Sequence, residues 1–177
     1  MRGFLHLILA LAIGAFIGWI SARSMVESLP LKAVAGIANW HEYNGVDELL
    51  LPYAVGHFSS RGELPPPNVA RYFHRTVDDD GNSLRGECIY EVKGRLLAAR
   101  WWSMAIANPR GERSVIAAGD VMRESDGSLI LSLAPFPVPG NRLTSPPGSQ
   151  LTFSYVIQSD TPDAPVASLP ALRKVRC

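Results

Sequence analysis

The sequence has few of the features that support catalysis or nucleic-acid binding. Lysine and arginine total 17, aspartate and glutamate total 16, and no run of basic residues occurs among the 177 residues. Nucleic-acid-binding domains usually carry a clustered basic surface, so this charge pattern argues against a nucleic-acid partner. The sequence also lacks the nucleophile-elbow, Walker-type and dinucleotide-binding glycine patterns. We therefore expect no cofactor, and we favour a protein without enzymatic activity while leaving that question open.

The small groups of titratable residues have simpler structural explanations. Three successive aspartates at 78–80 resemble the start of a calcium loop, but Ser83 stands where the EF-hand pattern needs glycine. Glu87 and Glu91 share one face of a predicted strand at a separation of roughly 13 Å, which is wider than paired acid–base carboxylates need. No metal-ligand spacing occurs among His6, His41, His57 and His74. The sequence predicts neither catalytic residues nor a metal site.

One long apolar run lies at the N-terminus. Residues 3–22 carry no formal charge, and as a helix they would span roughly 30 Å, the thickness of the hydrocarbon layer of a bilayer. Arg2 precedes the run, Arg23 follows it, and Trp19 lies near its far end, where indole rings favour the interface. We expect residues 1–24 to form a transmembrane anchor. The alternative is a signal peptide cleaved after Ala22, although the run is longer than a usual signal core.

The flanking charges indicate how this segment is oriented. The positive-inside rule favours the N-terminus in the cytoplasm, because Arg2 and the α-amino group precede the apolar run. We predict a single-pass protein of the inner membrane whose C-terminal domain lies in the periplasm. Gly14 and Gly18 have the G-x-x-x-G spacing that lets a second helix approach closely, although glycine is also simply common in membrane helices.

The remainder of the chain has the pattern of one β-rich domain. We expect a linker over residues 25–36 and a single domain over residues 37–177, with a short helix near 52–61. Period-two alternation with intervening turns predicts strands over 71–77, 84–93, 100–107, 113–117, 120–124, 128–134 and about 151–157. The first two would form a hairpin around the turn at 79–82. The predicted fold class is an all-β, jelly-roll-like antiparallel sandwich.

The chain has two cysteines, Cys88 and Cys177, which are 89 positions apart. In a domain outside the cytoplasm, such a pair predicts one disulfide, which would hold the C-terminal strand against the sheet. The alternative is two separate free thiols.

Adjacent tryptophans in the segment Arg100-Trp101-Trp102-Ser103 must point to opposite faces of a strand. We expect Trp102 to enter the core with Met104 and Ile106. Trp101 would then either cover another part of the domain or belong to a binding surface.

Several segments resemble the bacterial family called domain of unknown function 1214. The most specific are Cys88-Ile89-Tyr90 and Ala99-Arg100-Trp101-Trp102-Ser103, and Pro139-Gly140-Asn141 and Val175-Arg176-Cys177 also match. Family members commonly have Asn-Trp-Leu-Pro where this chain has Asn141-Arg142-Leu143-Thr144.

The resemblance implies a jelly-roll-like sandwich and attaches no reaction to it. It also implies a possible partner, a membrane-anchored protein with the sister domain of unknown function 1254. We take Arg100, Trp101 and Asn141 as candidates for a binding surface. The sequence therefore favours a binding or assembly module of the envelope, and the alternative is a carbohydrate-binding or glycan-modifying envelope protein.

Overall fold

The computed structural model describes residues 2–27, 32–34, 37–43, 70–97, 99–158, 166 and 168–177. The predicted short helix at 52–61 lies outside these residues. The chain divides into two compact units, one containing the N-terminal helix and the other containing the strands.

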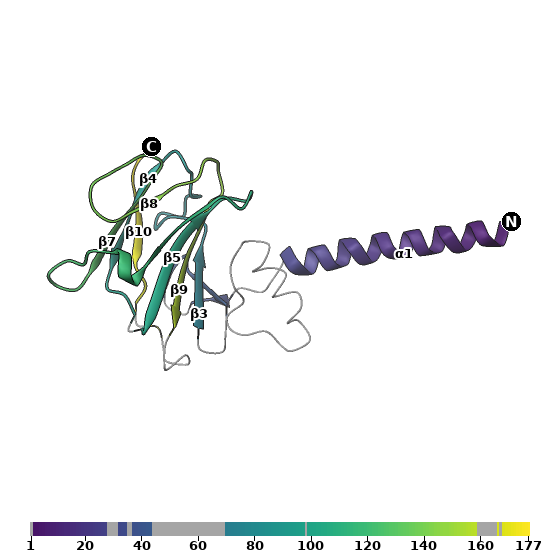
Figure 1. Ribbon diagram of the computed structural model, residues 1–177, viewed down its shortest axis with the longest axis horizontal. Coiled ribbons are helices and arrows are strands. Elements are labelled where there is room, and N and C mark those ends of the chain that lie inside the picture. Colours follow the sequence, from purple (N-terminus) through teal and green to yellow (C-terminus); the bar gives the residue numbers. More distant parts are fainter. Residues whose placement is uncertain are drawn as a thin grey trace. The chain divides into compact units, whose positions relative to one another are not determined.

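The N-terminal unit contains the helix α1, Arg2–Glu27 (Figure 1). The predicted apolar helix is confirmed, and it ends three residues beyond the expected boundary at 24. Its segment His6–Val26 is long and apolar enough to cross a membrane. Eleven large apolar side chains from Phe4 to Met25 are exposed to solvent, with 45–70% of each accessible. The helix therefore has no polar face that would suit it to water.

The larger sheet has six strands in the order β1-β2-β3-β9-β5-β6. Their bounds are β1 Lys32–Ala33, β2 His41–Tyr43, β3 Ala70–Arg75, β9 Thr152–Gln158, β5 Trp101–Ala107 and β6 Arg113–Ala117. All neighbouring pairs in it are antiparallel. The strand β1 lies inside the predicted linker at 25–36, so ordered pairing begins earlier in the chain than expected.

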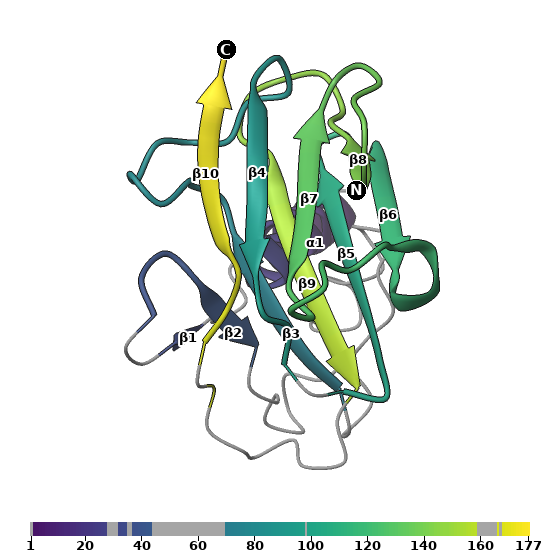
Figure 2. The ribbon, with the colours of Figure 1, turned by 90° about the vertical axis from the view of Figure 1, so that its left-hand side faces the viewer.

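The smaller sheet has four strands in the order β10-β4-β7-β8, and Figure 2 shows it in front of the larger one. The bounds are β10 Ala171–Arg176, β4 Ile89–Gly94, β7 Leu129–Ala134 and β8 Arg142–Thr144. The pair β7 and β8 is parallel, whereas the other pairs are antiparallel. The predicted β-sandwich is confirmed, with the addition of this one parallel pair.

Two local predictions were wrong. The segments 71–77 and 84–93 do not form a hairpin, because β3 pairs with β2 and β9 while β4 pairs with β10 and β7. Between these two segments the structure has one isolated bridge, from Val77 to Ser83, before the chain crosses to the other sheet.

The segment 120–124 is not a strand. Ala118–Asp120 forms the 3-10 turn η2. The backbone N–H and carbonyl of Met122 are then satisfied by the side chain of Asn141, at 2.7 and 2.6 Å, so they need no sheet partner.

One hydrophobic core lies between the two sheets. Phe73, Phe153 and Tyr155 face it from the larger sheet, and Tyr90, Val92 and Leu131 face it from the smaller. Trp102, Met104 and Ile106 are buried in it as predicted. The alternation along β9 is also confirmed.

The outer face of the larger sheet is less solvated than the alternation predicts. Five side chains on that face are buried, namely Tyr43, Tyr72, His74, Ser103 and Ser154. Period-two alternation shows which side of a sheet a residue faces, but it cannot show whether that side is covered.

Candidate functional site

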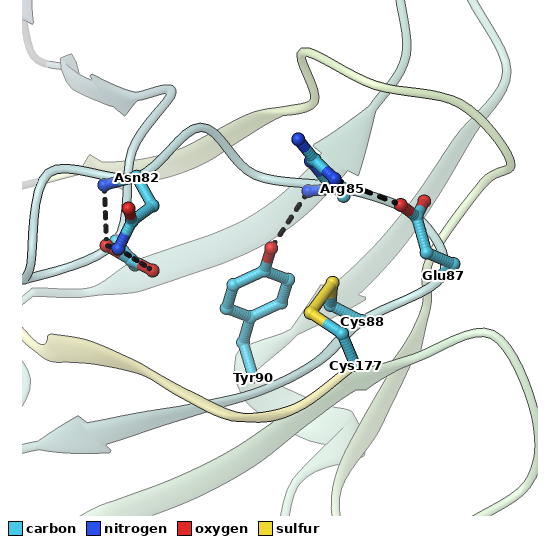
Figure 3. The surroundings of a disulfide bond; sticks show 7 residues. Asn82, Arg85, Glu87, Cys88, Tyr90 and Cys177 are labelled. Atoms are coloured by element: carbon cyan, nitrogen blue, oxygen red, sulfur yellow. Dashed lines mark hydrogen bonds and ion pairs between the residues drawn. A yellow bond between two sulfur atoms is a disulfide. The ribbon is translucent and has the colours of Figure 1, made fainter.

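The pocket of interest lies beside the disulfide, at the end of the domain where β4 begins and β10 ends. It has a volume of about 320 Å³ and is lined by Asn82, Ser83, Arg85, Cys88, Tyr90, Lys174 and Cys177. Figure 3 shows the Tyr90 ring rising beside the two cysteines towards the backbone of Arg85. Its lining residues come from the loop 78–88, from β4 and from β10.

The disulfide forms one wall of the pocket. Cys88 and Cys177 are bonded through their sulfur atoms, with Cα atoms 4.0 Å apart. Cys88 is buried immediately before β4, whereas Cys177 is exposed immediately after β10. Since β10 is an edge strand that pairs with β4 alone, the bond closes the free end of that pairing.

Asp78 sets the shape of the loop that forms the next wall. Its side chain is fully buried, and its Oδ1 accepts hydrogen bonds from the backbone N–H groups of Asp80 and Asn82, at 3.0 and 2.8 Å. The side-chain amide of Asn82 donates to the same carboxylate. Gly81 takes a positive φ of 84°, which glycine adopts without strain. The predicted turn is therefore present, held by Asp78.

Asp79 ties the same turn to β10. Its backbone N–H donates to the carbonyl of Leu172 at 2.9 Å, and its Oδ2 accepts the N–H of Leu172 at 2.9 Å. Its Oδ1 accepts from Arg75, whose side chain is 1% exposed. The guanidinium of Arg75 lies 5.2 Å from the ring centroid of Trp40. Burial lowers the pKa of Arg75, and the hydrogen bond that Arg75 donates to Asp79 opposes that shift.

The far side of the loop is pressed against the segment 146–149. The N–H of Gly86 donates to the carbonyl of Gly148 at 2.8 Å. A Cβ atom on Gly86 would lie 2.1 Å from the carbonyl oxygen of Pro146, so only glycine fits there without moving the backbone. With Asp78 on one side and Gly86 on the other, the loop is held in place before any molecule enters the pocket.

Tyr90 forms the buried back of the pocket. Its side chain is 1% exposed, and its hydroxyl oxygen accepts the backbone N–H of Arg85 at 2.9 Å. Burial raises the pKa of Tyr90, while the hydrogen bond from Arg85 acts in the opposite direction. The phenol is therefore protonated at neutral pH and retains a proton that it can donate.

Raising the pH above about 10, the ordinary tyrosine pKa, is expected to lower the free energy of unfolding. Burial raises the pKa of Tyr43, Tyr90 and Tyr155, so the unfolded chain releases these protons before the folded protein does. Urea midpoints should fall from about pH 10 upwards, and tyrosinate absorbance should lag in the folded protein. Tyr90→Phe should show a smaller fall. A constant midpoint accompanied by early tyrosinate absorbance would contradict this.

Two cations line the pocket opening. Arg85 contributes one and Lys174 of β10 the other, and both residues are exposed. Glu87 lies 3.9 Å from Arg85, but both side chains are more than 60% exposed. An exposed pair of this kind interacts weakly and leaves Arg85 available to another anion.

The comparison with family models decides the classification. The model described as "Protein of unknown function (DUF1214)" matches residues 69–158. The chain belongs to the DUF1214 family.

The DUF1214 match begins just before β3 and ends with β9, so it includes Cys88 and Tyr90 but not Lys174 or Cys177. The pocket is thus made partly by β10, outside the matched residues. No curated protein matches the chain.

Two solved structures are similar to this chain, and the first of them shares its fold. The VPA0106 protein from Vibrio parahaemolyticus has a TM-score of 0.52 and 17% identity, with 63% of this chain and 32% of that chain covered. An uncharacterized protein from Burkholderia cenocepacia has a TM-score of 0.46 and 19% identity, with 63% and 30% covered. The chain therefore spans about a third of the length of either.

The structure places the candidate surface residues of this DUF1214 protein on two different sheets. Arg100 and Trp101 lie at the start of β5, where 44% of Trp101 is exposed. Asn141 directly precedes β8, and its side chain bonds to the backbone of Met122 and to the carbonyl of Ile130. The amide of Asn141 therefore holds two chain segments together, whereas the side chain of Trp101 remains partly exposed to solvent.

The other candidate positions have different surroundings. On α1, a Cβ atom added to Gly14 or Gly18 would meet nothing within 4 Å.

Sequence reasoning identified the two cysteines but missed Asn82, Arg85 and Lys174 as pocket residues. Nothing in their spacing could have shown them together, because the loop and β10 are about 90 residues apart.

Proposed function

We propose that this DUF1214 protein is a membrane-anchored binding domain, held in the inner membrane by α1 with its sandwich in the periplasm. The carrying observation is that α1 exposes a mainly apolar surface over about the length that a bilayer requires. Every backbone group within a helix is bonded internally, so this segment is suited to hydrocarbon.

The disulfide supports the periplasmic orientation. Disulfides persist in oxidising compartments, which include the bacterial periplasm, and are rare in the cytosol. The bond between Cys88 and Cys177 closes the edge strand β10, so it is part of the folded domain. The positive charge before the apolar run favours the same orientation.

A reporter experiment tests this topology. Alkaline phosphatase fused after Cys177 is expected to be active in cells, and green fluorescent protein exported by the same route is expected to be dark. The double variant Cys88→Ser/Cys177→Ser is the matched control, because it should keep the topology and lose the mobility difference on non-reducing gels. An active fluorescent fusion together with reduced cysteines in the wild type would contradict the proposal.

A binding role is supported by the rigid, preformed pocket. Its loop is held by Asp78, Asp79 and Gly86 without help from a ligand. Preformed concave sites with a few convergent polar groups are typical of small-ligand binding.

A partner protein is the second part of the proposed role, and an anchored domain of unknown function 1254 protein is the first partner to test. Detergent extraction followed by affinity capture should recover it. Gly14→Ile and Gly18→Ile should reduce recovery if α1 makes the contact, since bulky side chains prevent close helix approach. Capture that is equally weak with wild type and with unrelated anchored proteins would contradict partner binding.

Glycan binding is the alternative function, supported by the exposed indole of Trp101. That function needs a carboxylate or polar groups beside the ring, and the residue opposite Trp101 in the sheet is Gln158. Trp101→Ala should then abolish retention on envelope glycans. If retention is unchanged, this alternative fails.

A further inference from the structure

We propose that the pocket beside the disulfide binds a small organic anion, with its carboxylate or phosphate group held by Arg85 and Lys174. This rests on the proposed binding function and names the class of ligand.

The pocket presents hydrogen-bond donors from three separate parts of the chain. Arg85 and Ser83 come from the loop, Tyr90 from β4 and Lys174 from β10. The oxygen of Tyr90 already accepts the N–H of Arg85, so its own proton is directed elsewhere. Charged donors form short, strong hydrogen bonds to carboxylate and phosphate oxygens.

The nearby carboxylates do not cancel this charge. Asp78 is fully buried and its oxygens already accept from Asp80 and Asn82. Asp79 is bonded to Arg75 and to the backbone of Leu172. Glu87 contacts Arg85 only across 3.9 Å at an exposed position. The cations of the pocket are therefore the groups with unused capacity to bind an anion.

The charge of β10 strengthens the case. Arg173, Lys174 and Arg176 lie together on this strand and are all exposed. Arg176 packs against the ring of Phe136, whereas Lys174 lines the pocket. A cluster of one sign beside a cleft raises the local concentration of oppositely charged solutes.

The size of the pocket limits the ligand. A volume of about 320 Å³ is at the small end for ligand sites. It suits a metabolite of a few carbons better than a polymer chain. The two cysteines and Tyr90 are the lining residues that supply apolar surface for the carbon portion.

Calorimetry on the full chain in neutral detergent tests the proposal. Succinate and glycerol phosphate serve as the two organic anions, and succinamide is the uncharged comparison. We expect millimolar or tighter binding of at least one anion, and none of succinamide. The anion that binds more tightly shows whether the pocket prefers a carboxylate or a phosphate group.

Three variants locate the site. Arg85→Gln and Lys174→Gln should each weaken binding by about tenfold, the loss typical of one charged hydrogen bond. Arg173→Gln is the matched control, because it removes a cation from the same strand at the neighbouring position, which faces the other side. It should change affinity less than about threefold, because it only lowers the positive potential around the pocket and salt screens that effect.

A measurement on the wild-type protein avoids dependence on variants. Acylation of Lys174 by an amine reagent, followed by mass spectrometry, should be slowed by the bound anion, while acylation of Lys93 should not. No binding of either anion, or equal losses in Lys174→Gln and Arg173→Gln, would overturn the proposal. Those results concern the purified protein alone, so they are distinguishable from a failed topology experiment.

Discussion

Replacing Cys88 and Cys177 together by serine is expected to lower the free energy of unfolding by about 2–5 kcal/mol. The bond closes a loop of 89 residues, and its loss restores conformational freedom mainly to the unfolded chain. The edge strand β10 would then keep its pairing with β4 and the hydrogen bonds between Leu172 and Asp79 at its other end. Urea unfolding followed by tryptophan fluorescence, in neutral detergent, measures the change.

Reduction of the wild-type protein provides the control for this prediction. A reductant should produce nearly the same loss as the double serine variant, and it should have no effect on that variant. Anion binding should weaken in both, because Cys88 and Cys177 form a wall of the pocket. An unchanged urea midpoint in the reduced protein would contradict the prediction, because it would show that β10 is held without the disulfide.

Asp79→Ala is expected to cost about 3–5 kcal/mol, the usual effect of leaving a buried charge without its partner. The change strands the guanidinium of Arg75, which is 1% exposed, and removes the acceptor for the N–H of Leu172. The remaining bond from Arg75 to the carbonyl of Val77 does not neutralise the charge. Urea unfolding measures the loss, and hydrogen exchange of the β10 amides should accelerate with it.

Two further variants separate the charge effect from a general effect of mutating the turn. Asp80→Ala is the matched control, because Asp80 is the exposed neighbour of Asp79 in the same turn, and it should change stability by less than about 0.5 kcal/mol. The double variant Arg75→Met/Asp79→Ala should be more stable than Asp79→Ala alone, since it removes the unpaired cation. If the double variant is the less stable of the two, the unpaired charge is not the cause.

These variants also show why three identical residues in a row have different roles. Asp78 is buried and holds the turn, Asp79 joins the turn to β10, and Asp80 faces solvent. The sequence presents them as one acidic cluster. Only their directions in the folded chain distinguish them.

Much of the architecture could be predicted from local pattern. The uncharged run at residues 3–22 is a helix, because its residues are almost all apolar and no proline interrupts them. The alternation in β9 and the pair Trp101-Trp102 correctly indicated which side chains enter the core. The turn at 79–82 is predicted from aspartate, glycine and asparagine together. Each of these depends on residues close in the chain, where spacing directly sets geometry.

The tertiary structure alone decided the pairing of the strands and the position of the pocket. A period of two shows that a segment is a strand but not which strand lies beside it, so β3 and β4 were wrongly paired. Asp79 meets Leu172 across 93 positions, and Lys174 reaches the pocket from β10. Such contacts arise from how the whole chain covers one core. No local periodicity encodes them, because the choice of partner depends on which pairing buries the most apolar surface with every backbone group satisfied.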